Sequence, residues 1–399
     1  MSFLRTLATA LTPRGDFLHR GRSNRRGRQV SRILRSAADS RPDQGFTSLF
    51  VTAPDDLLLH VRIYGSRATS ALPVVCLPGL ARTAADFHAL ATALSADPAE
   101  PRWVVALDYR GHGKSDYDSD ADNYGLRRDL LDLLAVLTAL NIAPAIFVGT
   151  SLGGVLAMML ARSRPAAIAG VILNDIGPVI EPRALLQIKG YMGKLPVPRD
   201  FAEGGEILRR LFSARFPKLT PQDWIAFAKR TWREHGGVLV LDYDVRLART
   251  LQANLEHSPP TLWDEFDALA DVPLMIVRGA NSTMLTSRTM DAMLARRGEI
   301  DIVVVPDQGH APLLDEAKLI RRIADFVASC FRPSVHHHRD REAFVPRLSP
   351  AARASLRSGT REAVDAGLGA GLGPGRSEAV RCPGPAAAVH ENEQVAALG

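Results

Sequence analysis

The chain has 399 residues, of which 46% are hydrophobic, and a formal net charge of +6. This length can bury a substantial core, in one large domain with tails or in two modest domains. No run approaches the roughly 20 apolar residues of a membrane-spanning helix, and the apolar start 3–11 is interrupted by Arg5 and lacks the pattern of a secretory signal. The composition therefore argues against a membrane span and predicts a soluble protein.

Residues 1–45 carry much of the basic excess, with no aromatic platform or nucleic-acid motif beside it: Arg14, Arg20, Arg22, Arg25, Arg26, Arg28, Arg32 and Arg35. We therefore expect a flexible arm and no nucleic-acid partner. A polyanion-binding segment and an organelle transit peptide are the alternatives.

The three cysteines are odd in number and far apart, which favours a reducing compartment and predicts a cytoplasmic location.

From residue 46, short β-rich runs alternate with helical stretches, which predicts an α/β fold with a mostly parallel sheet and helices on both faces. Eight runs are typical of strands: 47–52, 57–63, 74–77, 103–108, 145–149, 171–174, 274–278 and 302–305. Between the middle strands an amphipathic helix is indicated by leucines at helical spacing: Leu126, Leu130, Leu133, Leu134 and Leu137.

After the sixth strand the alternation stops, and we interpret residues of about 178–258 as an inserted helical cap. We expect most of its aromatic side chains to pack the cap onto the core: Tyr191, Phe212, Phe216, Trp224, Phe227 and Trp232.

Residues 334–399 have no hydrophobic period and predict a disordered tail, in which the run 336–338 of three histidines is solvated. The predicted domain is thus 46–333.

The clearest chemical motif is the Gly-x-Ser-x-Gly sequence of residues 149–153, between a buried strand and an apolar helix. In this context the motif is typical of a nucleophile elbow, in which the serine occupies a strained turn and small neighbours avoid collisions. The turn exposes the serine hydroxyl at the edge of the sheet. We predict that Ser151 is the nucleophile; a structural serine in a glycine-rich turn is the alternative.

A serine nucleophile needs a base for its proton and donors for the oxyanion. His310 follows the last predicted strand in a glycine-containing loop, and the chain order Ser, acid, His fits such a site. We predict His310 as the general base. Gly79 permits a tight approach in the loop after strand 74–77, so we predict an oxyanion hole from the backbone N–H groups of Leu80 and Leu152.

These motifs resemble the α/β-hydrolase superfamily over about residues 46–333. Residues 78–80 take the place of the family's common His-Gly loop, and residues 111–115 (Gly-His-Gly-Lys-Ser) resemble a turn that members carry after the next strand. That turn is usually architectural, so we expect His112 to be structural. The resemblance implies an eight-stranded α/β-hydrolase fold with a helical cap inserted after strand six, and it implies no metal or organic cofactor.

The usual position of the acid holds no carboxylate. The family commonly carries it just after the seventh strand, where this chain has Asn281, Ser282 and Thr283. Some members instead take the acid from the end of the sixth strand, where this chain has Asp175, and Asp175 is our candidate. A carboxylate at a hinge or helix start is the other interpretation of Asp175, and Asn281 is a neutral alternative partner for His310.

Together these residues predict a serine hydrolase that cleaves a carboxylic ester or related small-molecule acyl substrate through an acyl-enzyme. By resemblance, a serine nucleophile argues against dehalogenase and epoxide hydrolase chemistry. A ligand-binding or signalling protein with little turnover is one alternative, suggested by the missing acid. A carbon–carbon bond hydrolase or lyase is another. The substrate and the oligomeric state do not follow from the sequence.

Overall fold

The computed structural model describes residues 33–35, 45–249, 251 and 261–330. The predicted tail 334–399, and the predicted arm 1–45 apart from Ile33–Arg35 and Gly45, lie outside the described residues. Within the described ranges, no helix combines the length and the apolar character needed to cross a membrane.

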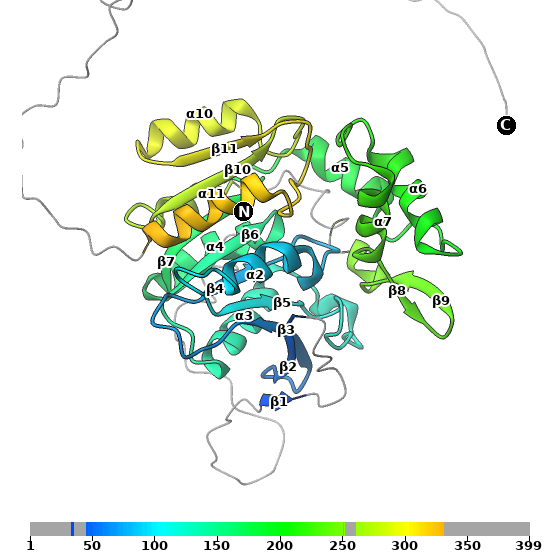
Figure 1. Ribbon diagram of the computed structural model, residues 1–399, viewed down its shortest axis with the longest axis horizontal. Coiled ribbons are helices and arrows are strands. Elements are labelled where there is room, and N and C mark those ends of the chain that lie inside the picture. Colours follow the sequence, from blue (N-terminus) through cyan, green and yellow to red (C-terminus); the bar gives the residue numbers. More distant parts are fainter. Residues whose placement is uncertain (1–32, 36–44, 250, 252–260, 331–399) are drawn as a thin grey trace, which may run out of the picture. The chain divides into compact units, whose positions relative to one another are not determined.

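A nine-stranded sheet organises the described part of the chain, in the order β1-β2-β3-β5-β4-β6-β7-β10-β11 (Figure 1). Strands β5 to β11 of this order are parallel, and β1, β2 and β3 extend the sheet in antiparallel fashion. The strands are β1 (Ile33–Arg35), β2 (Thr47–Thr52), β3 (Leu58–Tyr64), β4 (Val74–Leu77), β5 (Val104–Leu107), β6 (Ala145–Thr150), β7 (Ile168–Asn174), β10 (Leu274–Gly279) and β11 (Asp301–Val305). All eight predicted strands are confirmed, and β1 is an addition that the sequence pattern did not indicate.

Helices cover both faces of the sheet. Strand residues of alternating position contribute to two separate hydrophobic clusters, because successive side chains of a strand point to opposite faces. One cluster includes side chains of α3 (Leu126–Ala139), α4 (Leu152–Ser163), α9 (Trp263–Asp267) and α10 (Ser287–Arg296), and the other includes those of α2 (His88–Ser95) and α11 (Ala317–Ser329). The amphipathic helix expected from the leucine spacing is α3.

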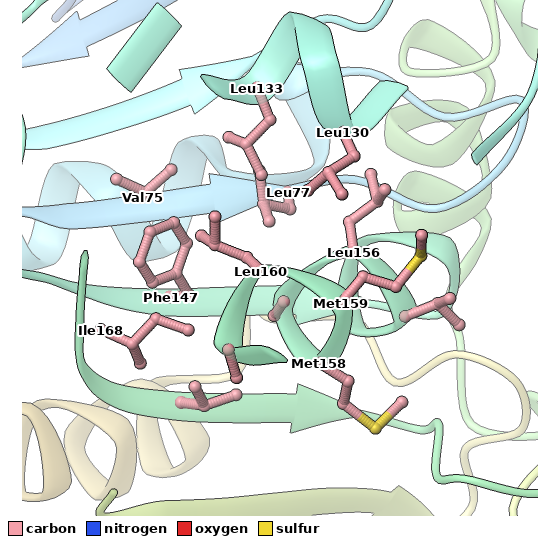
Figure 2. Close-up of a cluster of buried hydrophobic side chains, with 14 of the residues drawn as sticks. Val75, Leu77, Leu130, Leu133, Phe147, Leu156, Met158, Met159, Leu160 and Ile168 are labelled. Carbon is pink, nitrogen blue, oxygen red and sulfur yellow. The ribbon is translucent and has the colours of Figure 1, made fainter. Parts of the chain in front are cut away.

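Helix α4, which begins directly after Ser151, lies deep in the first of these clusters. Leu156 and Leu160 are fully buried, and in Figure 2 they lie beside Phe147 of β6 and Leu77 of β4. Fully burying one such side chain stabilises the fold by about 1.5–3 kcal/mol. The turn between β6 and α4 is therefore held between two well-packed elements.

Between β7 and β10 the chain forms an inserted segment with its own hydrophobic cluster. Its elements are α5 (Pro182–Tyr191), α6 (Phe201–Phe212), α7 (Pro221–Lys229), and the hairpin of β8 (Trp232–His235) and β9 (Val238–Leu241). Helices were expected here, but the hairpin was not. Residues 250 and 252–258 of the expected cap lie outside the described residues.

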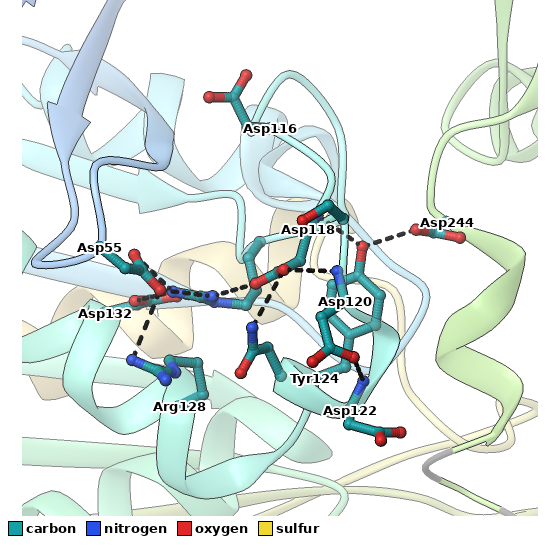
Figure 3. A network of polar contacts seen from close by, with 12 residues as sticks. Asp55, Asp116, Asp118, Asp120, Asp122, Tyr124, Arg128, Asp132 and Asp244 are labelled. Carbon is teal, nitrogen blue, oxygen red and sulfur yellow. Dashed lines mark hydrogen bonds and ion pairs between the residues drawn. The ribbon is translucent and has the colours of Figure 1, made fainter.

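A buried arginine fixes the loop after β5. The Arg110 side chain is fully buried and donates to the carboxylates of Asp132 at 2.7 Å, Asp118 at 2.6 Å and Asp55 at 3.1 Å (Figure 3). Each charged nitrogen thus has a partner, without which burying the guanidinium would be costly. Since Asp132 belongs to α3, the network ties the loop to the helix.

Asp129, one turn before Asp132 on α3, is buried without such compensation. Desolvation and the neighbouring Asp132 charge raise the pKa of Asp129 from 3.8 to about 8, against the attraction of Arg110. No hydrogen bond or ion pair of its carboxyl group is found in the described part of the chain. Asp129 is therefore mostly protonated at neutral pH.

We expect the free energy of unfolding of Asp129→Asn to rise relative to that of the wild type as the pH increases from about 4 to about 8. The folded protein retains the Asp129 proton over this interval while the unfolded chain releases it, so the wild type loses stability there, by at most about 4 kcal/mol between pH 5 and pH 8. Thermal unfolding of both proteins at several pH values measures the divergence. The exposed Asp122→Asn variant is the control, and an equal divergence for both variants would refute the assignment.

Candidate active site

Ser151 occupies a strained turn between β6 and α4. Its φ of 50° and ψ of −113° place it in a conformation that non-glycine residues rarely adopt. The Ser151 N–H donates to the Asn174 carbonyl at 3.0 Å, and the Ser151 carbonyl accepts from the Gly154 N–H at 2.9 Å. The turn is thereby fixed to the ends of β7 and α4, and the half-buried Ser151 side chain borders a cavity.

Close backbone packing explains why the residue two after the serine is glycine. A Cβ at Gly153 would overlap the carbonyl group of Leu77 on the neighbouring strand β4. A Cβ at Gly79 would lie 3.6 Å from the Ser151 Cβ, so the loop after β4 runs directly beside the serine. The elbow and this loop meet at the carboxyl edge of the sheet.

The structure brings together the three side chains that the sequence singled out. His310 Nε2 lies 3.0 Å from Ser151 Oγ, and His310 Nδ1 lies 2.8 Å from Asp175 Oδ2. A carboxylate can only accept, so Nδ1 carries the proton and Nε2 is free to accept from the Ser151 hydroxyl. Asp175 is fully buried, whereas the His310 side chain is 12% exposed.

Two further groups hold the Asp175 carboxylate. The Gly279 N–H donates to Oδ1 at 3.0 Å, and the Ser282 hydroxyl donates to Oδ2 at 2.5 Å. Ser282 stands where the family commonly carries its acid, and its contact with Asp175 is not evident from the sequence. The alternative partner Asn281 points elsewhere, because its side-chain amide donates to the Arg215 carbonyl at 3.2 Å.

Asn174, the residue before Asp175, ties the same region together. Its side-chain amide donates to Thr150 Oγ1 and to the Pro312 carbonyl, each at 3.0 Å. Thr150 precedes the serine and Pro312 follows the histidine by two residues. Asn174 therefore links the loops that carry Ser151 and His310, and its contribution was not recognised in the sequence.

Two backbone N–H groups next to Ser151 are available to a ligand. Leu152 is the first residue of α4, where an N–H has no partner within the helix, and Leu80 lies in the loop that runs beside Ser151. Among the described residues, neither N–H is matched with an acceptor. These are the two donors predicted to form an oxyanion hole.

The inserted segment forms one wall of the cavity beside Ser151. Four of the six aromatic residues noted there line it, namely Tyr191, Phe212, Phe216 and Phe227. All six also pack in the hydrophobic cluster of the inserted segment, in which Phe212, Phe216, Trp224 and Trp232 are buried. Burial raises the pKa of Tyr191, which keeps its hydroxyl neutral. The wall is thus mainly apolar and uncharged.

One side of the cavity carries paired charges. Arg82 donates to Asp86 through two nitrogens, one of them at 2.7 Å, and to Thr231 Oγ1 at 3.0 Å. Arg230 lies 3.2 Å from Asp315. Each guanidinium therefore has a carboxylate beside it, and this side of the cavity is close to electrically neutral.

In the described part of the chain, no three His, Cys, Asp or Glu residues are arranged to hold a metal ion.

Comparisons with known proteins agree with this architecture. Residues 74–323 match the alpha/beta hydrolase family. The chain is 34% identical over 272 residues to a 3-hydroxybutyrate-oligomer hydrolase of Cupriavidus necator, covering 65% of this chain and 91% of that protein. It is 26% identical over 286 residues to an sn-1-specific diacylglycerol lipase of Danio rerio, covering 70% of this chain and 82% of the lipase.

A solved structure gives the same result. The crystal structure of an alpha/beta hydrolase from Novosphingobium aromaticivorans superposes with a TM-score of 0.66 at 36% identity, covering 71% of this chain and 98% of the other. The family match spans more than half of the sequence, and the relatives are matched over most of their length. This chain therefore belongs to the alpha/beta hydrolase family and is a hydrolase.

Proposed function

We propose that the protein is a serine hydrolase that cleaves a carboxylic ester through an acyl-enzyme. The observation that carries this proposal is the continuous hydrogen-bonded series from Asp175 through His310 to Ser151, which opens onto a cavity. Both distances are within the range in which a base can take a proton from a nucleophile.

The chemistry follows from these positions. Ser151 Oγ attacks the ester carbonyl carbon and its proton passes to His310 Nε2, while Asp175 stabilises the imidazolium. The negative oxygen accepts hydrogen bonds from the N–H groups of Leu80 and Leu152. The alcohol then leaves with the proton from His310, and a water molecule activated by the same nitrogen releases the acid from Ser151.

The names of the relatives support an ester as the substrate. A 3-hydroxybutyrate oligomer and a diacylglycerol both contain carboxylic ester bonds, and enzymes named for them are among the proteins this chain resembles. A binding protein without turnover was suggested by the missing acid after the seventh strand. The 2.8 Å contact of His310 with Asp175 removes that reason.

We further propose that the inserted segment acts as a cap over the cavity. Side chains of α5, α6 and α7 contribute to its wall: Ile188, Tyr191, Leu208, Phe212 and Phe227. Such a cover excludes water and selects substrates by shape. The cytoplasmic location predicted from the cysteine content stays a prediction.

The first test is covalent labelling with an active-site-directed fluorophosphonate. We expect the intact protein to be labelled and to hydrolyse p-nitrophenyl esters, and Ser151→Ala to lose both properties because the nucleophile is gone. Mass spectrometry of the labelled peptide identifies the modified residue. Labelling that persists in Ser151→Ala, or an inert wild type of normal fold, would sink the proposal.

The second test concerns the acid. Asp175→Asn should lower kcat by about 10⁴, because an amide favours the wrong imidazole tautomer, while the fold is retained. Asp307→Asn is a matched control, since Asp307 is close to His310 in sequence but is not bonded to it in the structure. Steady-state kinetics of both variants decide the matter: equal losses, or a loss below tenfold for Asp175→Asn, contradict the assignment.

The third test concerns substrate size. The cavity encloses about 130 Å³, and a protein cavity of roughly 150 Å³ holds one benzene molecule. We therefore expect short acyl groups to fit and long ones to require displacement of the aromatic wall. The ratio kcat/KM should be about tenfold or more higher for p-nitrophenyl butyrate than for the palmitate ester. A preference for the palmitate ester would show that the acyl chain lies elsewhere.

A further inference from the structure

The loop beside Ser151 contains a turn that its own sequence does not favour. The Arg82 N–H donates to the Gly79 carbonyl at 3.1 Å, which closes a four-residue turn over Leu80 and Ala81. Ala81, the third residue, has a φ of 60°, whereas Leu80 is not among the residues with positive φ. These angles define a type II turn, in which the third residue is usually glycine. Alanine at this position favours a type I turn instead.

An external hydrogen bond selects the observed turn. The Ala81 N–H donates to His112 Nε2 at 3.1 Å. Types I and II differ by a flip of the central peptide, which here joins Leu80 to Ala81. In a type I turn this N–H would point away from His112. The acceptor on His112 therefore favours the conformation that the alanine side chain disfavours.

The His112 ring is held in one orientation and one tautomer. It is 2% exposed, and its Nδ1 lies 2.9 Å from the Arg110 carbonyl. A carbonyl only accepts, so Nδ1 carries the proton and Nε2 is the acceptor for Ala81. Burial lowers the pKa of His112, although the Arg110 carbonyl, Asp108 and Asp244 act in the opposite direction. The ring therefore remains neutral.

The backbone around His112 is fixed from both sides. The Gly113 N–H donates to the Asp242 carbonyl at 2.8 Å, and the Asp244 N–H donates to the Gly111 carbonyl at 2.7 Å. The flanking loop is further anchored by the Arg110 network (Figure 3). The His112 acceptor is thus attached to a rigid frame.

We propose that His112 is a positioning residue that holds the Leu80 N–H in the orientation needed to bind the oxyanion. The Leu80 N–H belongs to the peptide next to the one that His112 fixes, and only the torsion angles of Leu80 separate the two. A flip of the Leu80–Ala81 peptide changes those angles beside Ser151. This role deepens the proposed function and rests on it; His112 itself touches neither substrate nor reacting atoms.

The kinetic test compares His112→Phe with His112→Gln. The phenyl ring fills the site without an acceptor, whereas the glutamine carbonyl reaches the position of Nε2. We expect His112→Phe to lower kcat by about 10- to 100-fold with KM nearly unchanged, since one oxyanion donor is worth about 10²–10³, and His112→Gln to recover most of the loss. A loss expressed in KM, or no recovery with glutamine, overturns the proposal.

A double-mutant comparison separates positioning from general stability. Glycine adopts positive φ readily, so in an Ala81→Gly background the turn depends less on His112. The kcat loss caused by His112→Phe should then shrink to below about tenfold. Tyr124→Phe serves as the matched control, because it removes the 2.6 Å hydrogen bond to Asp244 in the same region and leaves the Ala81 contact. An equal His112→Phe loss in both backgrounds would mean a purely structural role.

A readout that does not depend on catalysis completes the test. Amide hydrogen exchange of Ala81, followed by NMR in the full chain, should be about tenfold or more faster in His112→Phe than in the wild type and unchanged in Tyr124→Phe. Unchanged exchange in His112→Phe contradicts the proposal. If Ser151 were not labelled by a fluorophosphonate, the proposed function would fail, while this exchange result would still report whether His112 fixes the turn.

Discussion

The two hydrogen bonds of His310 are the constraint on which the site depends. One ring nitrogen must lie 3.0 Å from a serine after β6 while the other lies 2.8 Å from a carboxylate after β7. A parallel sheet makes this possible, because the carboxyl ends of its strands lie at one edge and β6, β7, β10 and β11 are successive neighbours there. The hydrogen bonds of Asn174 to Thr150 and Pro312 then fix the spacing between these loops.

Backbone strain is concentrated at the same edge. Of the six described non-glycine residues with positive φ, three are Ser151, Asp175 and Ala81. Each such residue costs about 1–3 kcal/mol and persists only where its surroundings over-determine it. The Asp175 N–H donates to the Val277 carbonyl at 2.7 Å. The Ser151 N–H donates to the Asn174 carbonyl, and the Ala81 N–H donates to His112 Nε2. The tightly packed sheet thus stabilises conformations that the isolated loops would not adopt.

The features that could be predicted well from the sequence are those that depend on residues close together in the chain. Strands appear as short apolar runs, α3 as leucines at helical spacing, and the elbow as glycines around Ser151. The contacts of Asp175 with Ser282 and of Ala81 with His112 join residues 107 and 31 positions apart. They depend on strand order and register, such as the pairing of Asn174 with Val277, which no local pattern contains. Helical spacing likewise does not say which aromatic side chains of the inserted segment also line the cavity.

The register of β7 and β10 also explains how the proposed acid, Asp175, can follow the sixth strand of the predicted series. Because these strands are parallel neighbours, the residues after Asn174 and after Val277 lie side by side. A carboxylate from either strand can therefore reach the same ring nitrogen of the histidine. With Asp175 in that role, a carboxylate at position 282 would repel it, whereas the Ser282 hydroxyl donates to Oδ2. The absence of an acid after β10 and the presence of one after β7 are thus two parts of a single electrostatic arrangement.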